Sequence, residues 1–305
     1  MSRHWLAQRE RGSRLALKAM TWIALKLGYG AGRLLLYPIC GYFLLFTRAA
    51  RRASRAYLRR VLGRASGWRE LFHHYHCFAA TLLDRVYLLT EHHPRSFDTR
   101  VHGADLVWER RARGQGCILL GSHLGSFEIL RALGMFHHDL PINVLMYEEN
   151  SKKINTVLGA LNPRVAERVI HIGTPDSLLR AQECVARGEL VGILGDRVAD
   201  SHKVVSCTFL GERVMLPAGP LLLASALGAP VILFFGLYRG AGRYDVHFEL
   251  LAERITISKQ PEQRQRDLEY WAQRYAARLE HYCRTAPFNW FNFYDYWNEC
   301  ERAVL

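Results

Sequence analysis

The sequence predicts an α/β fold with a central mixed sheet flanked by helices, preceded by an N-terminal, membrane-associated helical segment. Two observations lead to this prediction. From about residue 115 onward, short apolar runs alternate with helix-like segments, as they do in α/β sheet proteins. Before residue 61, the chain is strongly basic and rich in bulky apolar residues. We therefore divide the 305 residues into an anchoring segment, 1–60, and a sheet domain, 61–305.

The positive charge of the protein is concentrated in the anchoring segment. Residues 1–60 contain thirteen Lys and Arg and one acid, Glu10, whereas the rest of the chain contains 28 basic and 27 acidic side chains. The basic residues interleave with bulky apolar ones, a pattern typical of helices that bind anionic membranes. A nucleic-acid partner, which a basic terminus can also indicate, is therefore not expected.

The anchoring segment also carries a long apolar run. The uncharged stretch "LLLYPICGYFLLFT" (34–47) has 14 residues, fewer than the ~20 that cross a bilayer as a straight helix. The 21 residues from 27 to 47 would suffice, but they include Arg33 and Pro38. The arginine-rich "RAARRASRAYLRR" (48–60) that follows is typical of a cytoplasmic flank. The sequence thus predicts membrane attachment and leaves open whether this segment spans the bilayer or lies in its interface.

The pattern of apolar residues predicts the other elements in chain order. Strands are expected at 117–121, 142–147, 169–172, 190–194, 204–209, 230–238 and 244–251. Helices are expected within 61–100 and at 126–136, 151–161, 217–227 and 262–284, and another from an N-cap at Thr174 to Gly188.

A histidine lies just beyond the first of these strands, in "ILLGSHLGSFEIL" (118–130). His123 is flanked by Gly121 and Gly125, and Glu128 follows five positions later. On one helix these two side chains would diverge by about 140°, so we expect His123 in the loop and Glu128 in the first helical turn. A carboxylate beside an imidazole makes the histidine a competent general base. The sequence therefore predicts a hydrogen-bonded His123–Glu128 pair at the carboxyl end of a strand.

Other readings of the same residues stay open. The G-x-H-x-G pattern is like a nucleophile elbow with His in place of Ser, so a serine hydrolase or thioesterase using the adjacent Ser122 is one alternative. A non-catalytic membrane scaffold is another. No metal site is expected, because the repeated histidines lack a neighbouring cysteine or carboxylate cluster (His73, His74, His76, His92 and His93). Seven scattered cysteines without a CxxC pair indicate a reducing, cytosol-facing location.

Several motifs together resemble a known family. The order strand, G-S-H-x4-E, helix, and then a later strand ending in "GDR" (195–197), resembles the glycerolipid acyltransferase superfamily. It is closest to the late lipid A acyltransferases, the bacterial lauroyl and myristoyl transferases. "FLGERVMLPAGPLLLASALGAPVILFF" (209–235) and "RTAPFNWFNFYDYW" (284–297) are similar to stretches of that family. The GDR turn and the aromatic ending look more like the branch found in aryl-polyene and pigment-lipid gene clusters. Many late lipid A enzymes carry an arginine where Glu148 follows Tyr147 here, which argues against a phosphorylated acceptor.

This resemblance implies a glycerolipid acyltransferase-like fold and an O-acyltransferase without a metal or cofactor. The donor would be a fatty acyl thioester of acyl carrier protein or coenzyme A, and the acceptor a lipid or glycolipid hydroxyl. His123 would remove the hydroxyl proton, Glu128 would orient the imidazole, and the alkoxide would attack the thioester directly. Arg197 is assigned to anionic groups of a substrate. The resemblance implies a monomer on the cytoplasmic face of a bacterial inner membrane, with acyl carrier protein and membrane lipids as partners. Residues expected to bind substrate are Gly121, Ser122, Gly125, Ser126, Asp196 and Arg197.

Overall fold

The computed structural model describes the backbone over residues 14–89, 97–130, 141–147, 168–173, 176–198 and 203–297, and side chains from residue 28 onward within these ranges. The helices predicted at 126–136 and 151–161 lie partly or wholly outside the described residues, as do Thr174, His92, His93, Glu148 and Cys300.

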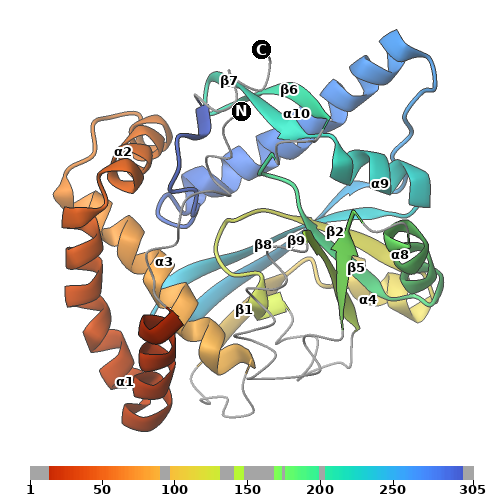
Figure 1. Ribbon diagram of the computed structural model, residues 1–305. Coiled ribbons are helices and arrows are strands. Elements are labelled where there is room, and N and C mark those ends of the chain that lie inside the picture. Colours follow the sequence, from red (N-terminus) through yellow and green to blue (C-terminus); the bar gives the residue numbers. More distant parts are fainter. Residues whose placement is uncertain are drawn as a thin grey trace.

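One sheet organises the described chain, and its strands follow the order β1-β9-β8-β2-β5-β3-β4 (Figure 1). Neighbouring strands are parallel except for the antiparallel β8–β9 hairpin, so the predicted mixed sheet is confirmed. The strands are β1 (Asp98–His102), β2 (Cys117–Gly121), β3 (Ile142–Tyr147), β4 (Val169–Ile172), β5 (Leu190–Leu194), β8 (Val231–Gly240) and β9 (Arg243–Ala252). A separate antiparallel hairpin joins β6 (Val204–Phe209) and β7 (Glu212–Pro217).

Strand β2 lies at the centre of this sheet. Its sequence is an unbroken apolar run rather than an alternating one, which fits a strand that is covered on both faces, and every residue of it is buried. Leu120 pairs with Ile193 of β5 on one side and with Leu233 of β8 on the other. The loop after β2 therefore emerges beside the loop after β5.

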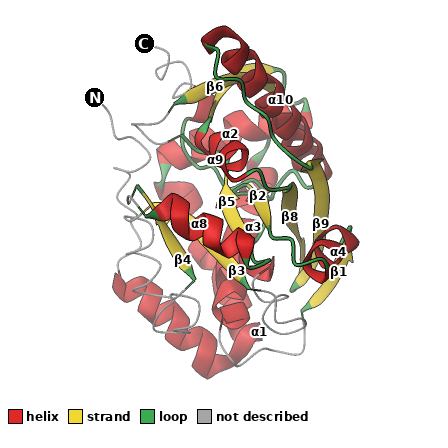
Figure 2. Cartoon of the chain, turned by 90° about the vertical axis from the view of Figure 1, so that its right-hand side faces the viewer, coloured by secondary structure: helices red, strands yellow, loops and turns green. Residues whose placement is uncertain are grey.

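Helices cover both faces of the sheet (Figure 2). Helix α8 packs against β4 and β5, α3 contacts β8, and α10 packs against β6 and α9. The helices are α1 (Arg14–Phe46), α2 (Arg48–Leu62), α3 (Trp68–Leu89), α4 (Asp105–Ala112), α8 (Ser177–Ala186), α9 (Gly219–Leu227) and α10 (Pro261–Thr285).

Helix α1 kinks at Gly28, where φ is 83°. Beyond the kink, a stripe of residues four apart is buried against α3 (Gly32, Leu36, Cys40 and Leu44). Within the described part of the chain, Gly28–Phe46 is the one helical segment long and apolar enough to cross a membrane, by length and composition alone. Its outer face is exposed and apolar, with Leu34, Leu45 and Phe46 between 60 and 72% exposed.

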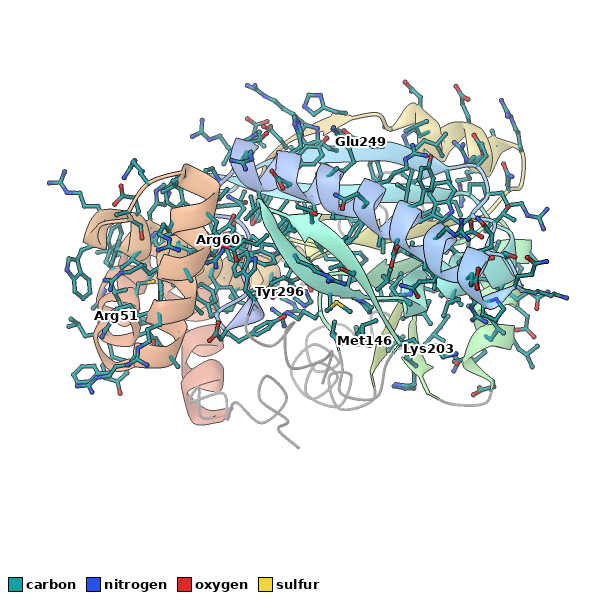
Figure 3. All side chains as sticks on the ribbon, turned by 90° about the horizontal axis from the view of Figure 1, so that it is seen from above. Arg51, Arg60, Met146, Lys203, Glu249 and Tyr296 are labelled. Carbon is teal, nitrogen blue, oxygen red and sulfur yellow. The ribbon has the colours of Figure 1, made fainter. Side chains whose placement is uncertain are left out.

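The end of α1 is fixed by the start of α2. The Arg51 guanidinium donates to the carbonyls of Leu44 and Leu45, which otherwise lack helical partners. Figure 3 shows Arg51 within the layer that α1, α2 and α3 form beside the sheet. Because α2 buries Tyr57 and Leu58, its arginines at 48, 52, 55 and 59 fall on one exposed face.

The structure corrects the predicted elements in three places. Residues 61–100 are not one helix, because the chain turns at Gly63, where φ is 67°, and forms β1 from Asp98. Two elements were not predicted: α4, a short helix of low amphipathicity, and β7, where no element was expected between the strand at 204–209 and the helix at 217–227. Strand β1 is an exposed edge strand with a polar sequence, so it lacks the apolar run that identifies the central strands.

Candidate active site

His123 lies in the loop two residues after β2 and is held by one carboxylate. Its Nδ1 is 2.7 Å from Asp196 Oδ1, and its backbone N–H donates to Asp196 Oδ2 at 3.0 Å. Asp196 follows β5, and the carboxyl ends of adjacent parallel strands meet at one edge of the sheet. The two residues are thus brought together by topology, although 73 positions separate them in the sequence.

The loop that carries His123 is pinned by backbone hydrogen bonds on both sides. Gly125 N–H donates to Asn289 O, Ser126 N–H to Gly236 O, and Phe291 N–H to His123 O, each at 2.8 Å. Gly125 has a φ of 71°, and a Cβ there would lie 1.9 Å from Gly236 O. Only glycine permits this approach of the loop to β8. The N–H groups of Gly125 and Ser126, predicted to bind substrate, already have backbone acceptors.

Asp196 is completely buried and accepts four hydrogen bonds. Besides the two from His123, Oδ2 accepts from Trp290 Nε1 and from Asn292 Nδ2, each at 3.0 Å. Burial alone would raise the pKa of Asp196, but the charge and hydrogen bonds of His123 and the nearby Arg197 hold it well below its usual value. The carboxylate is therefore ionised at neutral pH.

The protonation of His123 follows from its surroundings. Burial and the positive charge of Arg197 lower the pKa of His123, against the opposing charges of Asp196 and Glu128. The imidazole is consequently neutral at neutral pH. Because an ionised carboxylate can only accept, Nδ1 carries the proton and Nε2 carries the free lone pair. The side chain keeps 27% of its surface exposed, and no hydrogen bond to Nε2 occurs among the described residues.

Glu128 does not have the predicted contact. Its Oε1 lies 2.6 Å from Arg85 NH2 of α3, whereas the imidazole Nδ1 is occupied by Asp196. The expected hydrogen-bonded pair of His123 and Glu128 is thus replaced by His123 and Asp196. Glu128 still acts on the imidazole at longer range, because its negative charge raises the pKa of His123. The sequence offered one signal for this partner: Asp196 follows β5 directly, but it was predicted to bind substrate instead.

The remaining predicted residues gather around this pair. Arg197 Nε donates to Asn292 Oδ1 at 2.7 Å, and its NH2 donates to Phe291 O at 2.9 Å. The Ser122 and Ser126 hydroxyl oxygens are buried without a hydrogen-bond partner in the described part of the chain. Trp290 and Asn292 contact Asp196 directly. Neither residue was singled out from the sequence, where residues 284–297 counted only as a stretch similar to the family.

Residues 4–299 match the family model of the bacterial lipid A biosynthesis acyltransferases. The chain belongs to this family. Its members are acyltransferases, so the resemblance to the late lipid A acyltransferases is confirmed and the chain is an enzyme of this class. A search among curated proteins finds no match.

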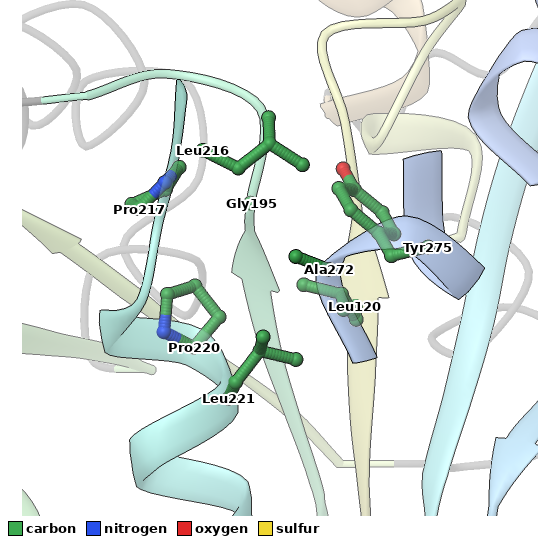
Figure 4. Close-up of a pocket in the computed structure, with 8 residues that line it drawn as sticks. All are labelled: Leu120, Gly195, Leu216, Pro217, Pro220, Leu221, Ala272 and Tyr275. Atoms are coloured by element: carbon green, nitrogen blue, oxygen red, sulfur yellow. The ribbon is translucent and has the colours of Figure 1, made fainter. Parts of the chain in front are cut away.

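The acyltransferase has a small apolar pocket beside Gly195, the residue before Asp196 in the chain. Figure 4 shows its lining, in which Tyr275 contributes the one side-chain hydroxyl. That hydroxyl donates to Gly121 O at 2.8 Å, so the pocket shares a wall with the loop that carries His123. The pocket is lined by Leu120, Gly195, Leu216, Pro217, Pro220, Leu221, Ala272 and Tyr275.

Proposed function

We propose that this acyltransferase moves a fatty acyl group from a thioester of acyl carrier protein or coenzyme A to a hydroxyl of a lipid or glycolipid. One observation carries the proposal. A neutral imidazole at the end of the central strand has Nδ1 bonded to a buried carboxylate and Nε2 accessible. This is the arrangement that a general base requires.

The reaction follows from the free lone pair of Nε2. The acceptor hydroxyl gives its proton to Nε2, and its oxygen forms a bond to the thioester carbonyl carbon. The carbon–sulfur bond then breaks, and the departing thiolate takes the proton from the imidazolium. Asp196 stabilises the imidazolium through the short Nδ1 hydrogen bond, so the charge that develops on His123 is compensated within the protein.

Arg197 supplies positive charge next to the base. We assign it to anionic groups of the donor or the acceptor. Its hydrogen bonds to Asn292 and Phe291 O hold the guanidinium in place. They therefore reduce the conformational entropy that Arg197 would lose when it binds an anion.

A serine hydrolase is less well supported. Such an enzyme needs the nucleophile within hydrogen-bond distance of the histidine. The Ser122 hydroxyl is buried and forms no bond with His123 among the described residues. Direct transfer therefore remains our proposal, without an acyl-enzyme and without a metal.

We also infer that the chain binds the cytoplasmic face of a bacterial inner membrane through α1 and α2. The outer face of α1 exposes Leu34, Tyr42, Leu45 and Phe46. The exposed arginine face of α2 follows it directly in the chain. An apolar helix face next to a row of cations matches the acyl boundary and the anionic headgroups of a bilayer.

The packing of α1 favours an in-plane position over a membrane-spanning one. Tyr29 donates to Asp84 of α3 at one end of the segment, and Thr47 is bonded to Tyr75 of α3 at the other. Asp84 in turn accepts from Tyr244 of β9, so α3 is tied to the sheet. A spanning α1 would draw these buried polar groups into the hydrocarbon, which is unfavourable. An in-plane α1 leaves the sheet domain in water and presents only its outer face to lipid.

The test compares lipids from cells with the gene, without it, and with His123→Ala or Asp196→Asn in its place. Mass spectrometry should show one lipid class that gains a fatty acyl group only with the wild-type gene. The mass of that lipid also identifies the acceptor as a lipid A precursor, another glycolipid or a polyene-bearing lipid. Full acylation by His123→Ala, or an acyl group covalently bound to Ser122, would overturn the direct-transfer mechanism.

A further inference from the structure

The Asp196 carboxylate owes half of its hydrogen bonds to a segment far from both strands of the site. Trp290 Nε1 and Asn292 Nδ2 both donate to Oδ2, the oxygen that does not face the imidazole ring. We propose that Trp290 and Asn292 are positioning residues that set the basicity of His123 through Asp196. This proposal rests on the proposed function of His123 as the base.

Trp290 is itself rigidly held. Its side chain is fully buried, with the rings of Tyr57, Phe209 and Tyr296 centred 4.8 to 5.2 Å away. Leu124, next to His123, forms a β-bridge with it. The indole N–H is thus aimed at Asp196 by packing on the ring and by pairing on the backbone.

A buried histidine supports the same tryptophan from the other side. His74 Nε2 lies 2.8 Å from Trp290 O, and its Nδ1 lies 2.7 Å from Ser54 Oγ. Burial lowers the pKa of His74 to about 4, so this ring is neutral at neutral pH. An Nε2–H that donates to Trp290 O leaves Nδ1 to accept from the Ser54 hydroxyl, which satisfies all three groups. The bonded series Ser54, His74, Trp290, Asp196 and His123 therefore joins α2 and α3 to the site.

Asn292 has a different task, because its amide lies between two charged groups. Nδ2 donates to Asp196, while Oδ1 accepts from Arg197 Nε. A guanidinium free to form a paired contact with Asp196 would compete with the imidazole N–H, since such charge-assisted pairs are strong. Because Asn292 bonds to both residues, its side-chain oxygen holds the Arg197 guanidinium away from Asp196. Oδ1 of Asp196 then remains free to accept from His123.

The two roles predict opposite effects on the base. Without the indole N–H, the Asp196 carboxylate is less stabilised and attracts the imidazolium more strongly, so the pKa of His123 rises. Without the Asn292 amide, Asp196 also loses one donor, but Arg197 turns toward Asp196 and its full positive charge outweighs that loss, so the pKa of His123 falls. A hydrogen bond of ordinary net strength corresponds to a change of about half to one pH unit in each direction.

The experiment measures thioester cleavage of lauroyl-coenzyme A by the full-length enzyme, with a lipid extract as acceptor, as a function of pH. The acidic limb of kcat/KM reports the pKa of the free base. We expect Trp290→Phe to move this limb to higher pH and Asn292→Leu to move it to lower pH. In each variant kcat should fall roughly 10-fold because the base is less well oriented. Phe209→Leu is the matched control: it loosens the packing around Trp290 but removes no hydrogen bond, and it should leave the limb in place.

Three results separate the possible failures. If both variants keep the wild-type limb while Asp196→Asn is inactive, the proposed positioning is wrong and the proposed function stands. If Asp196→Asn and His123→Ala are both active, the proposed function itself is wrong. If Phe209→Leu shifts the acidic limb as much as Trp290→Phe does, the shift comes from loosened packing and not from the lost hydrogen bond, and the proposal is wrong. Should Trp290→Phe fail to fold, the wild-type protein gives the answer by NMR, because one indole N–H signal must titrate together with His123.

Discussion

At the scale of single residues, the site depends on which carboxylate serves the imidazole. Asp196 bonds to Nδ1, and Glu128 bonds to Arg85 instead. The two carboxylates therefore have separable effects on catalysis, although both influence the pKa of His123.

We expect Asp196→Asn to lower kcat roughly 10²–10⁴-fold, because the amide cannot stabilise the imidazolium and allows the wrong tautomer. Glu128→Gln should cost about 10-fold or less, since it removes only a longer-range charge. Both constants come from initial rates of thioester cleavage with the purified variants. Equal losses in the two variants would mean that Glu128 reaches the imidazole during the reaction.

The pH dependence of the wild-type enzyme follows from the same environment. A base must be neutral to act, and the pKa of His123 is lowered from 6.5 by burial and by Arg197. The active range therefore extends to lower pH than a free histidine would allow. The acidic limb of kcat/KM, measured in buffers of constant ionic strength, should have its midpoint below 6.5. A midpoint above that value would show that Asp196 and Glu128 outweigh burial.

The sequence pointed to His123 but not to its hydrogen-bond partners. His123 stands out because a strand ends beside it and glycines flank it, which are local signals. The hydrogen bonds that Asp196 accepts from His123, Trp290 and Asn292 span 73 to 96 positions and arise only when the strands and the C-terminal segment meet. Local spacing favoured Glu128 because it is the nearest carboxylate in the chain, whereas the sheet order brings Asp196 closer.

At the scale of elements, the loop after β2 depends on close backbone contact. Gly125→Ala should lower the free energy of unfolding by roughly 3 kcal/mol or more. A Cβ there would collide with the backbone carbonyl of Gly236, so β8 or the loop must move. Gly63→Ala is the matched control, with a similar φ of 67° but open space around its Cβ, and it should cost about 1–2 kcal/mol. Denaturant unfolding of both variants measures the difference, and activity should be lost only in Gly125→Ala. Equal stability losses would mean that the loop relaxes freely.

The buried strands were predicted from the sequence more accurately than the exposed elements. The central strands β2 and β5 have unbroken apolar sequences, and the prediction gave their bounds correctly. The edge strand β1 and the short helix α4 have mostly polar sequences. β1 is held by pairing with β9, and α4 by contacts with the same strand, rather than by their own patterning. The pairing of β1 with β9 joins residues about 145 positions apart, which no local window could show.

At the scale of the whole molecule, the proposed membrane face can be tested without disturbing the core. Deleting residues 1–60 would remove Tyr57 and Leu58, which are completely buried, so a truncated protein is a poor reagent. Substitutions on the exposed face of α1 avoid this difficulty.

We expect Leu34→Glu combined with Leu45→Glu to release the enzyme from vesicles that contain anionic lipid, because two carboxylates would replace exposed apolar side chains at the bilayer. Leu178→Glu with Leu179→Glu is the control, since these leucines are also exposed but lie on α8. Vesicle sedimentation and alkaline carbonate extraction give the readout. An in-plane helix should be extracted by carbonate, whereas resistance to extraction would indicate a spanning segment.

The central position of β2 also bears on how the enzyme acquires its activity. Its two neighbours begin at residues 190 and 231, so the strand that leads to His123 is completed only when these two remote segments have docked on it. Such pairings close long loops and form late in folding, whereas helices such as α1 and α2 depend on local contacts and form early. During refolding from denaturant, helical circular dichroism should therefore recover before thioester cleavage does. If α1 and α2 bind lipid as proposed, a newly made chain would meet the bilayer with these helices in place before its catalytic site is assembled.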